Sequence, residues 1–126
     1  MDSNEPGIAP AELAAAVDQA RAASQKIRVG VVFTTEQQDW SAVRDWHADS
    51  SQSLHRKFAD TAAVLSMGPG RLVVYSTELN RERLGHNIRS ALGFADLPTR
   101  IGLSALSEHG TTADELLVAA FANATK

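Results

Sequence analysis

The chain has 126 residues, of which 44% are hydrophobic and 21% charged, and its 12 basic and 15 acidic side chains give a net charge of -3. These values predict one soluble globular domain, and the absence of cysteine excludes disulfides, thiolate metal sites and cysteine nucleophiles. The acidic balance argues against a nucleic-acid partner, and no apolar run reaches the roughly 18 residues of a membrane span. We expect a cytoplasmic protein, since a chain without cysteine suits a reducing compartment.

The first part of the chain is predicted to form a leader, a helix and a buried strand. Residues 1–10 contain prolines, a glycine and polar residues without periodicity, and we expect a flexible leader there. Apolar residues at helical spacing predict a helix over Pro10–Ser24, whose alanine-rich face would pack against the sheet or against a second copy of the chain. The β-branched run Ile27–Phe33 predicts a central strand that is buried on both faces.

A long polar segment over residues 36–60 follows and predicts a helix. The run Ala48–Ser53 has no apolar anchor, which favours a break in the helix there. Trp40 and Trp46 lie in this polar stretch, where two large aromatic side chains either cover the sheet or form a contact patch. A position in the core is the more common role for such tryptophans. Trp40 and Trp46 are nevertheless kept as candidate interaction residues.

The rest of the chain is predicted to form a hairpin, a helix, a strand and a final helix. These elements span residues 61–76 with a Gly-Pro-Gly turn at 68–70, residues 78–92, residues 99–106, and the segment that follows an N-cap at Thr111 or Thr112. Without the outer helices the order is βαββαβ, which predicts a ferredoxin-like α/β (α+β) fold with an antiparallel sheet and extra N- and C-terminal helices. Residues 11–126 would form this single domain.

Two segments carry a resemblance to a known family. The strand Arg100–Ala105, a short loop and the helix start Thr111–Leu117 are similar to the end of the diguanylate cyclase (GGDEF) domain, a nucleotide-cyclase palm. The segment Met67–Tyr75 stands where that family has its Gly-Gly-acid-acid-Phe turn and outgoing strand. The resemblance covers about residues 27–126 and implies the family's fold and a role in bacterial cyclic di-GMP signalling.

The departures from the family bear on catalysis. The resemblance implies that active members hold two Mg²⁺ ions with an acidic residue at the end of the first strand and another in the turn, since hard cations need carboxylate oxygens. Here the strand ends in Phe33–Thr35 with Glu36 as the nearest carboxylate, and the turn offers Pro69–Arg71. We therefore expect no metal, no cofactor and no cyclase activity. The family's product-inhibition Arg and Asp are also replaced, by Ala59 and Ala62.

Three functions are compatible with these features. The first is a regulatory or protein-interaction module whose partner is another protein or a second copy of the chain. The second is a receptor for a guanine nucleotide or cyclic dinucleotide in the vestigial pocket. Its candidate ligand-binding residues are Thr34, Thr35, Asp45, Gly68, Gly70 and Arg71. The third is an unrelated ferredoxin-like enzyme with His47 or His86 as a base.

Two further groups of residues could be either functional sites or ordinary structural features. Asp45, His47 and Asp49 could form a metal site, but positions two apart on a helix diverge by roughly 200°, which favours a solvated helix face. Gly68-Pro69-Gly70 could cradle a phosphate, but it lacks the lysine and the length of a P-loop. We expect a plain hairpin turn there.

Overall fold

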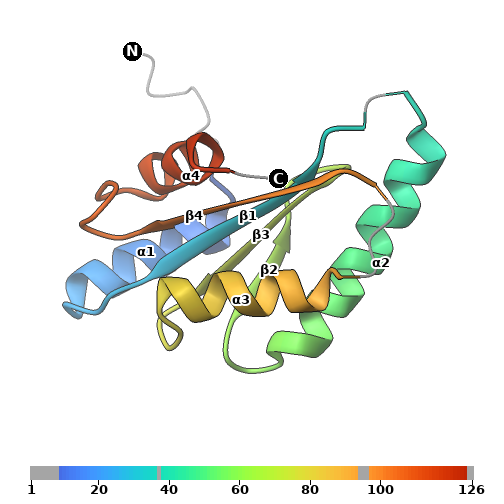
Figure 1. The fold of residues 1–126 in the computed structure, drawn as a ribbon. Helices are drawn as coiled ribbons and strands as arrows, with labels where there is room; N and C mark the ends of the chain where they lie inside the picture. Colours follow the sequence, from blue (N-terminus) through green and yellow to red (C-terminus); the bar gives the residue numbers. More distant parts are fainter. Residues whose placement is uncertain (1–8, 37, 94–96, 125–126) are drawn as a thin grey trace, which may run out of the picture.

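A four-stranded antiparallel sheet is the centre of the computed structural model, which describes residues 9–36, 38–93 and 97–124 (Figure 1). The elements in chain order are α1 (Ala11–Ala22), β1 (Arg28–Thr34), α2 (Trp40–Phe58), β2 (Ala63–Ser66), β3 (Arg71–Ser76), α3 (Arg81–Ala91), β4 (Thr99–Ala105) and α4 (Ala113–Ala122). Without α1 and α4 this order is βαββαβ. The predicted ferredoxin-like α/β fold with extra outer helices is therefore confirmed.

The strand order is β2-β3-β1-β4, so β1 lies between β3 and β4. In the register, Val31 of β1 lies opposite Val73 of β3 and Gly102 of β4. All strand pairs are antiparallel, so the end of β1, the β2–β3 turn and the start of β4 lie at one end of the sheet. The start of β1 lies at the other end, with the ends of β3 and β4.

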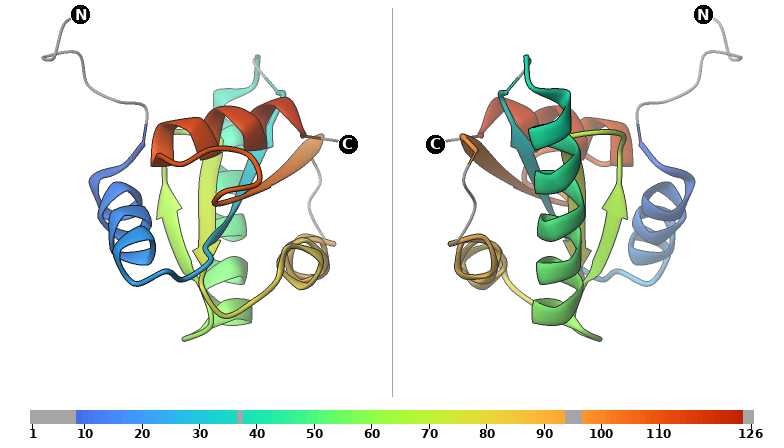
Figure 2. Two further views of the ribbon diagram at one scale, coloured as in Figure 1. Left: turned by 90° about the vertical axis from the view of Figure 1, so that its left-hand side faces the viewer. Right: turned by 90° about the vertical axis from the view of Figure 1, so that its right-hand side faces the viewer.

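Helices cover both faces of the sheet, with α2 and α3 on one face and α1 and α4 on the other (Figure 2). Successive residues of β1 alternate between the two cores: Val31 packs with α1 and α4, and Val32 packs with α2 and α3. This double cover explains why β1 is apolar at successive positions. The alanine-rich α1 packs on the sheet through the buried Leu13 and Val17, which is the first of its two predicted roles.

Helix α2 differs from its prediction. It runs without interruption from Trp40 to Phe58, so the predicted break at Ala48–Ser53 is wrong. Ser50, in the middle of that polar run, is only 1% exposed and lies on the buried face of α2. The helix is therefore packed against the core through this segment as well, although the segment has no large apolar side chain. A small hydroxyl side chain thus occupies a position on the buried face where an apolar residue was expected.

The two tryptophans of α2 have opposite environments. Trp46 is 5% exposed, and its Nε1–H donates to Thr99 Oγ1 at 3.0 Å. It is a core residue that anchors α2 to the start of β4, which corrects its assignment as a candidate interaction residue. Trp40 is 65% exposed, and its side chain is available at the surface.

Two sequence-based expectations concern the start of the chain and the membrane. The predicted leader falls on residues 1–8, outside the described residues, and on Ala9 and Pro10, where the Ala9 N–H donates to Asp114 Oδ1 at 2.8 Å. Within the described part of the chain, no helix has both the length and the apolar character needed to cross a membrane.

Candidate functional site

The end of β1, the β2–β3 turn and the start of α2 surround a cavity of about 360 Å³. The Thr34 N–H donates to the Gly70 carbonyl oxygen at 3.1 Å, which brings the end of β1 against the turn. The lining residues are Thr34, Glu36, Trp40, Val43, Pro69, Gly70 and Arg71. The sequence resemblance implies that the family's Gly-Gly-acid-acid-Phe turn stands at this place.

The β2–β3 turn is tight because of its proline and its second glycine. The Arg71 N–H donates to the Gly68 carbonyl oxygen at 3.2 Å, with Pro69 second in the turn and Gly70 third with a φ of 78°. This is the arrangement of a type II turn, in which the third position favours glycine. A Cβ on Gly70 would also lie 3.2 Å from Val43 Cγ1, so glycine lets the turn approach α2 closely.

The backbone N–H groups of the turn already have acceptors. The Gly68 N–H donates to Ser66 Oγ at 3.4 Å, the Gly70 N–H to His47 Nδ1 at 3.1 Å, and the Arg71 N–H within the turn itself. Pro69 has no N–H to offer. A phosphate cradle requires several N–H groups that point at the anion. The plain hairpin turn therefore accounts for this glycine-rich segment.

His47 joins α2 to the turn. Because its Nδ1 accepts a hydrogen bond from Gly70, its proton is assigned to Nε2, which lies 3.0 Å from Ser66 Oγ and donates to it. Burial lowers the pKa of His47 below its usual 6.5, because desolvation disfavours the charged ring. Both ring nitrogens are thus used in holding the hairpin, which leaves neither of them directed at a substrate in this arrangement.

The carboxylate nearest to the cavity has a structural role. Glu36 Oε2 accepts hydrogen bonds from the N–H groups of Gln38 at 2.8 Å and Asp39 at 3.1 Å. Asp39 in turn caps α2 by accepting from the Ala42 N–H at 3.0 Å. Glu36 therefore shapes the turn that leads into α2. Arg71, which lines the same cavity, contributes a positive charge.

No cluster of three or more His, Asp or Glu side chains that could hold a metal ion occurs among the described residues. This includes Asp45, His47 and Asp49, which diverge around α2 as their spacing of two predicts. The cavity at the end of β1 combines one carboxylate, that of Glu36, with the guanidinium of Arg71. Such a set of donors lacks the several oxygen ligands that Mg²⁺ prefers.

A second cavity, of about 540 Å³, lies beside the first on the other side of Trp40 and Pro69. Its lining residues are Trp40, Arg44, His47, Ala48, Ser66, Gly68 and Pro69. Trp40 and Pro69 line both cavities and separate them. The indole of Trp40 therefore stands between two hollows that are bordered by Arg44 on one side and Arg71 on the other.

The structure brings together part of the predicted ligand-binding set. Thr34, Gly70 and Arg71 line the first cavity and Gly68 lines the second, whereas Thr35 and Asp45 line neither. Asp45 lies on a different side of α2 from the residues that face the turn. Thr35 is exposed, and its N–H donates to the Pro98 carbonyl oxygen at 3.3 Å, toward the β4 side.

Several lining residues were absent from the predicted set, among them Val43 and Arg44 of α2. Their signal was present in the sequence, because they follow Trp40 by three and four residues, and such positions share one face of a helix. The spacing assigns Val43 and Arg44 to the cavities only if the face of α2 that carries Trp40 is known to lie next to the hairpin. The pairing of α2 with the hairpin is a tertiary contact that periodicity alone does not specify.

Solved structures of GGDEF domains share this fold. The chain is similar to a DGC protein from Thermotoga maritima, with a TM-score of 0.72 and 8% identity, over 90% of this chain and 88% of that chain. It is similar to the GGDEF domain of DgcB from Caulobacter crescentus in complex with c-di-GMP, with a TM-score of 0.71 and 10% identity, over 97% and 88% of the two chains.

A third similar structure is the active GGEEF domain of a diguanylate cyclase from Vibrio cholerae, with a TM-score of 0.70 and 11% identity, over 89% of this chain and 82% of that chain. At these identities the similarity establishes the fold, and it confirms the GGDEF-type palm that the sequence resemblance implied. No sequence family and no curated protein matches the chain.

Proposed function

We propose that this chain is a catalytically inactive GGDEF-type domain that works as a protein-interaction module in bacterial cyclic di-GMP signalling. The observation that carries the proposal is that Thr34 and Arg71 line one cavity. The sequence resemblance implies that the family's two metal-binding acids stand at these positions. A hydroxyl and a guanidinium replace the two carboxylates. The chain thus keeps the framework of a cyclase without the ligands for two-metal chemistry.

The charges around this cavity support the loss of catalysis. Glu36 is the one carboxylate in its lining, and its Oε2 already accepts two backbone hydrogen bonds. The guanidinium of Arg71 repels a divalent cation and cannot lose its proton at physiological pH. A metal ion would therefore meet one engaged carboxylate and one fixed positive charge.

The surface beside the cavity supports a role in protein binding. Trp40 is 65% exposed and stands with Pro69 between the two cavities, and Arg44 and Arg71 border this pair. Exposed tryptophan and arginine side chains are enriched among the residues that dominate binding energy at interfaces. The partner that fits best has apolar side chains for Trp40 and acidic side chains for the two arginines.

The catalytic part of the proposal is tested by incubating the purified chain with GTP and Mg²⁺ or Mn²⁺. Cyclic dinucleotide and pyrophosphate are then quantified, with an active diguanylate cyclase in the same buffer as the positive control. We expect no product above the protein-free blank. Formation of cyclic dinucleotide that is abolished by Glu36→Gln would contradict the proposal.

A second candidate function is favoured by the position of Arg71. Its guanidinium borders a cavity that Trp40 also lines, so that a phosphate could pair with Arg71 while a base stacks on the indole. Calorimetry with GTP and cyclic di-GMP tests this receptor function. A heat of binding that is lost in Arg71→Ala and retained in Arg56→Ala, a change at an exposed residue in the last turn of α2, would support it. The absence of heat at high protein concentration would reject it.

A further inference from the structure

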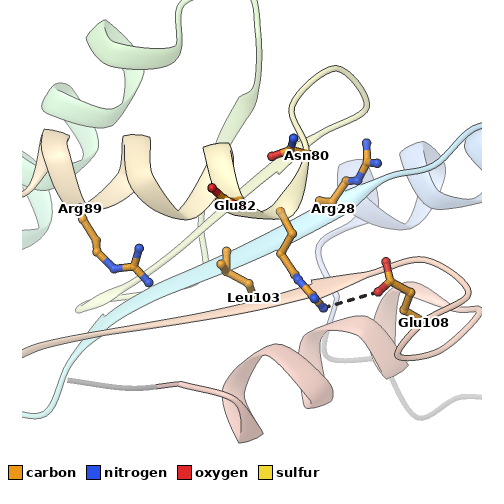
Figure 3. Close-up of a pocket in the computed structure, with 7 residues that line it drawn as sticks. Arg28, Asn80, Glu82, Arg89, Leu103 and Glu108 are labelled. Carbon is orange, nitrogen blue, oxygen red and sulfur yellow. Dashed lines mark ion pairs between the residues drawn. The ribbon is translucent and has the colours of Figure 1, made fainter.

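A second group of charged side chains lies beside the starts of β1 and α3 (Figure 3), which the register places at the end of the sheet opposite to the β2–β3 turn. They surround a cavity of about 430 Å³, within the range typical of small-ligand pockets. The lining residues are Arg28, Asn80, Arg81, Glu82, Arg89, Leu103 and Glu108. Neither cavity at the hairpin shares a residue with this one.

Arg28 and Arg81 reach the cavity from the first residues of β1 and α3. Arg28 opens β1 and lies opposite Ser76 and Ala105 in the register, next to the ends of β3 and β4. Arg81 opens α3 directly after the N-cap Asn80, whose Oδ1 accepts from the Arg83 N–H at 2.8 Å. Both arginines therefore have backbone positions that regular secondary structure holds in place.

Arg89 reaches the same cavity from two turns further along α3. Long side chains on a helix point back toward its N-terminus, which directs Arg89 over Gly85 and toward Arg81. A Cβ on Gly85 would lie 2.7 Å from Leu103 Cδ1 and 3.5 Å from Arg89 Nη1. Glycine at this position therefore lets α3 approach β4 and leaves room for the Arg89 guanidinium beside Leu103.

The positive charge in this cavity is incompletely compensated. Arg81 Nη1 lies 3.6 Å from Glu108 Oε1, and both side chains are about half exposed, which makes this a weak ion pair (Figure 3). Within the part of the chain that the structure describes, Arg28 and Arg89 have no ion pair. The lining side chains carry one more positive than negative charge, although the whole chain has a net charge of -3.

A contact beside the cavity brings two hydrogen-bond donors together. His109 Nδ1 accepts from the Ala105 N–H at 3.0 Å, which assigns the proton of the neutral ring to Nε2. This Nε2 lies 3.3 Å from Arg81 Nη1, which is also a donor. With this tautomer the two nitrogens are both donors and do not bond to one another, and an acceptor oxygen beside them could accept from both.

We propose that this cavity is an anion-binding site for a ligand that carries phosphate groups, held by Arg28, Arg81 and Arg89. Guanidinium groups match phosphate oxygens with paired hydrogen bonds, and they remain charged at every physiological pH. The three arginines border the cavity at different positions along α3 and β1, so a tetrahedral phosphate or a diphosphate can accept from several of them. A planar carboxylate offers two oxygens in one plane and satisfies fewer. A bound phosphate would also offer an acceptor to the Nε2–H of His109 and a further one to Arg81.

The experiment is a titration of the ¹⁵N-labelled chain with inorganic pyrophosphate, followed by NMR at constant ionic strength. We expect saturable shifts of the Gly85, Leu103 and Glu108 amide signals. Arg81→Ala and Arg89→Ala should each weaken binding by about tenfold or more, since a lost hydrogen bond to a charged group is worth roughly 1.5–3 kcal/mol. Arg89→Lys keeps the charge and loses the planar group, so its affinity should lie between those of the unmodified chain and Arg89→Ala. Arg100→Ala, at the start of β4 at the other end of the sheet and outside all three cavity linings, should bind as the unmodified chain does.

Three results would overturn the proposal. The first is the absence of saturation at millimolar pyrophosphate, and the second is binding that Arg81→Ala and Arg89→Ala leave unchanged. The third is equal affinity for succinate, which would assign the site to dicarboxylates. Arg81 and Arg89 are both exposed, so their replacement leaves the core intact. Shifts at Thr34 and Gly70 report on the hairpin cavity instead, which keeps failure here distinct from failure of the proposed function.

Discussion

His47 Nδ1 accepts a hydrogen bond from the Gly70 N–H at 3.1 Å, which links the middle of α2 to the β2–β3 turn 23 residues further along the chain. The same ring donates from Nε2 to Ser66 Oγ, which itself accepts from the Gly68 N–H. One neutral imidazole thereby organises both sides of the turn. A second proton on the ring would place an N–H at Nδ1, directly facing the N–H of Gly70.

The His47 contact predicts that stability falls at mildly acidic pH. Burial lowers the pKa of His47 in the folded chain below the 6.5 of the unfolded chain, so the unfolded chain binds more protons between these two values. The contribution of His47 is therefore fully present above pH 6.5 and is lost as the pH falls from there through the folded-state pKa. Urea denaturation at several pH values measures this loss as a decrease in the free energy of unfolding.

The matched variant for this prediction is His47→Asn. Its side-chain oxygen can accept from Gly70 without titrating, so we expect a flatter dependence of stability on pH between about 5 and 7. His86→Asn, the same substitution at an exposed position of α3, serves as the control for a histidine outside the hairpin contact. An identical slope for the unmodified chain and His47→Asn would show that His47 is not the titrating group.

The two tryptophans of α2 should differ sharply when each is replaced by alanine. Trp46→Ala removes a buried indole and its hydrogen bond to Thr99, and should lower the free energy of unfolding by about 3–5 kcal/mol. Trp40→Ala changes an exposed side chain and should stay within about 0.5 kcal/mol of the unmodified chain. Chemical denaturation measures both. A large loss of stability in Trp40→Ala would mean that its indole packs against the fold and is not available to a partner.

Ser50 is a buried polar residue whose Oγ has no hydrogen-bond partner among the described residues. Ser50→Ala removes this unsatisfied hydroxyl and introduces a better helix former, so it should raise the free energy of unfolding by about 1 kcal/mol. Ser53→Ala makes the same change at a half-buried position of α2 and isolates the effect of helix propensity. Equal gains in the two variants would mean that the Ser50 hydroxyl has no desolvation cost.

Gly102 lies beneath α4, where a side chain has no room. A Cβ at this position would collide with the carbonyl oxygen of Ala120, a backbone atom that cannot turn away. Gly102→Ala should therefore lower the free energy of unfolding by about 2–3 kcal/mol or more, as α4 is forced away from β4. Gly93→Ala is the matched control, because its Cβ would meet nothing closer than 3.8 Å. Similar thermal midpoints for the two variants would contradict the close approach of α4.

Substitution should be able to introduce metal binding at the hairpin cavity. Thr34→Asp combined with Arg71→Glu places two carboxylates around a cavity that already has Glu36 and removes the opposing charge. We expect the double variant to broaden nearby NMR signals with Mn²⁺ at lower concentrations than the unmodified chain does. Thr35→Asp with Arg56→Glu changes the net charge equally outside the cavity lining. Broadening of the same signals in this control would assign the effect to net charge alone.

Much of the fold could be predicted from local signals in the sequence. The strand over residues 27–33 agrees with β1 to within one residue at each end, because a β-branched run buried on both faces has a clear pattern. The N-cap at Thr112 was one of two predicted positions, and the structure selects it through a capping box with Glu115. The break in α2 was predicted wrongly, since the polar Ser50 gives no local sign that packing will bury it.

The candidate site was less predictable. Thr34 and Arg71 are 37 positions apart in sequence numbering, and the resemblance to a family was needed to place them together. Asp45 was included because of its chemistry, although the rotation of α2 turns it away from the cavity. The direction in which a helix faces depends on its contacts with other elements, and periodicity describes only the helix itself.

The sequence by itself determined most of the elements and their order, because periodicity, capping and residue type are local properties. The tertiary structure alone decided which distant side chains meet. It placed His47 on the hairpin, buried Trp46 while leaving Trp40 exposed, and gathered Arg28, Arg81 and Arg89 around one cavity. These outcomes depend on strand register and helix rotation, which are set by packing in the two cores of the sheet.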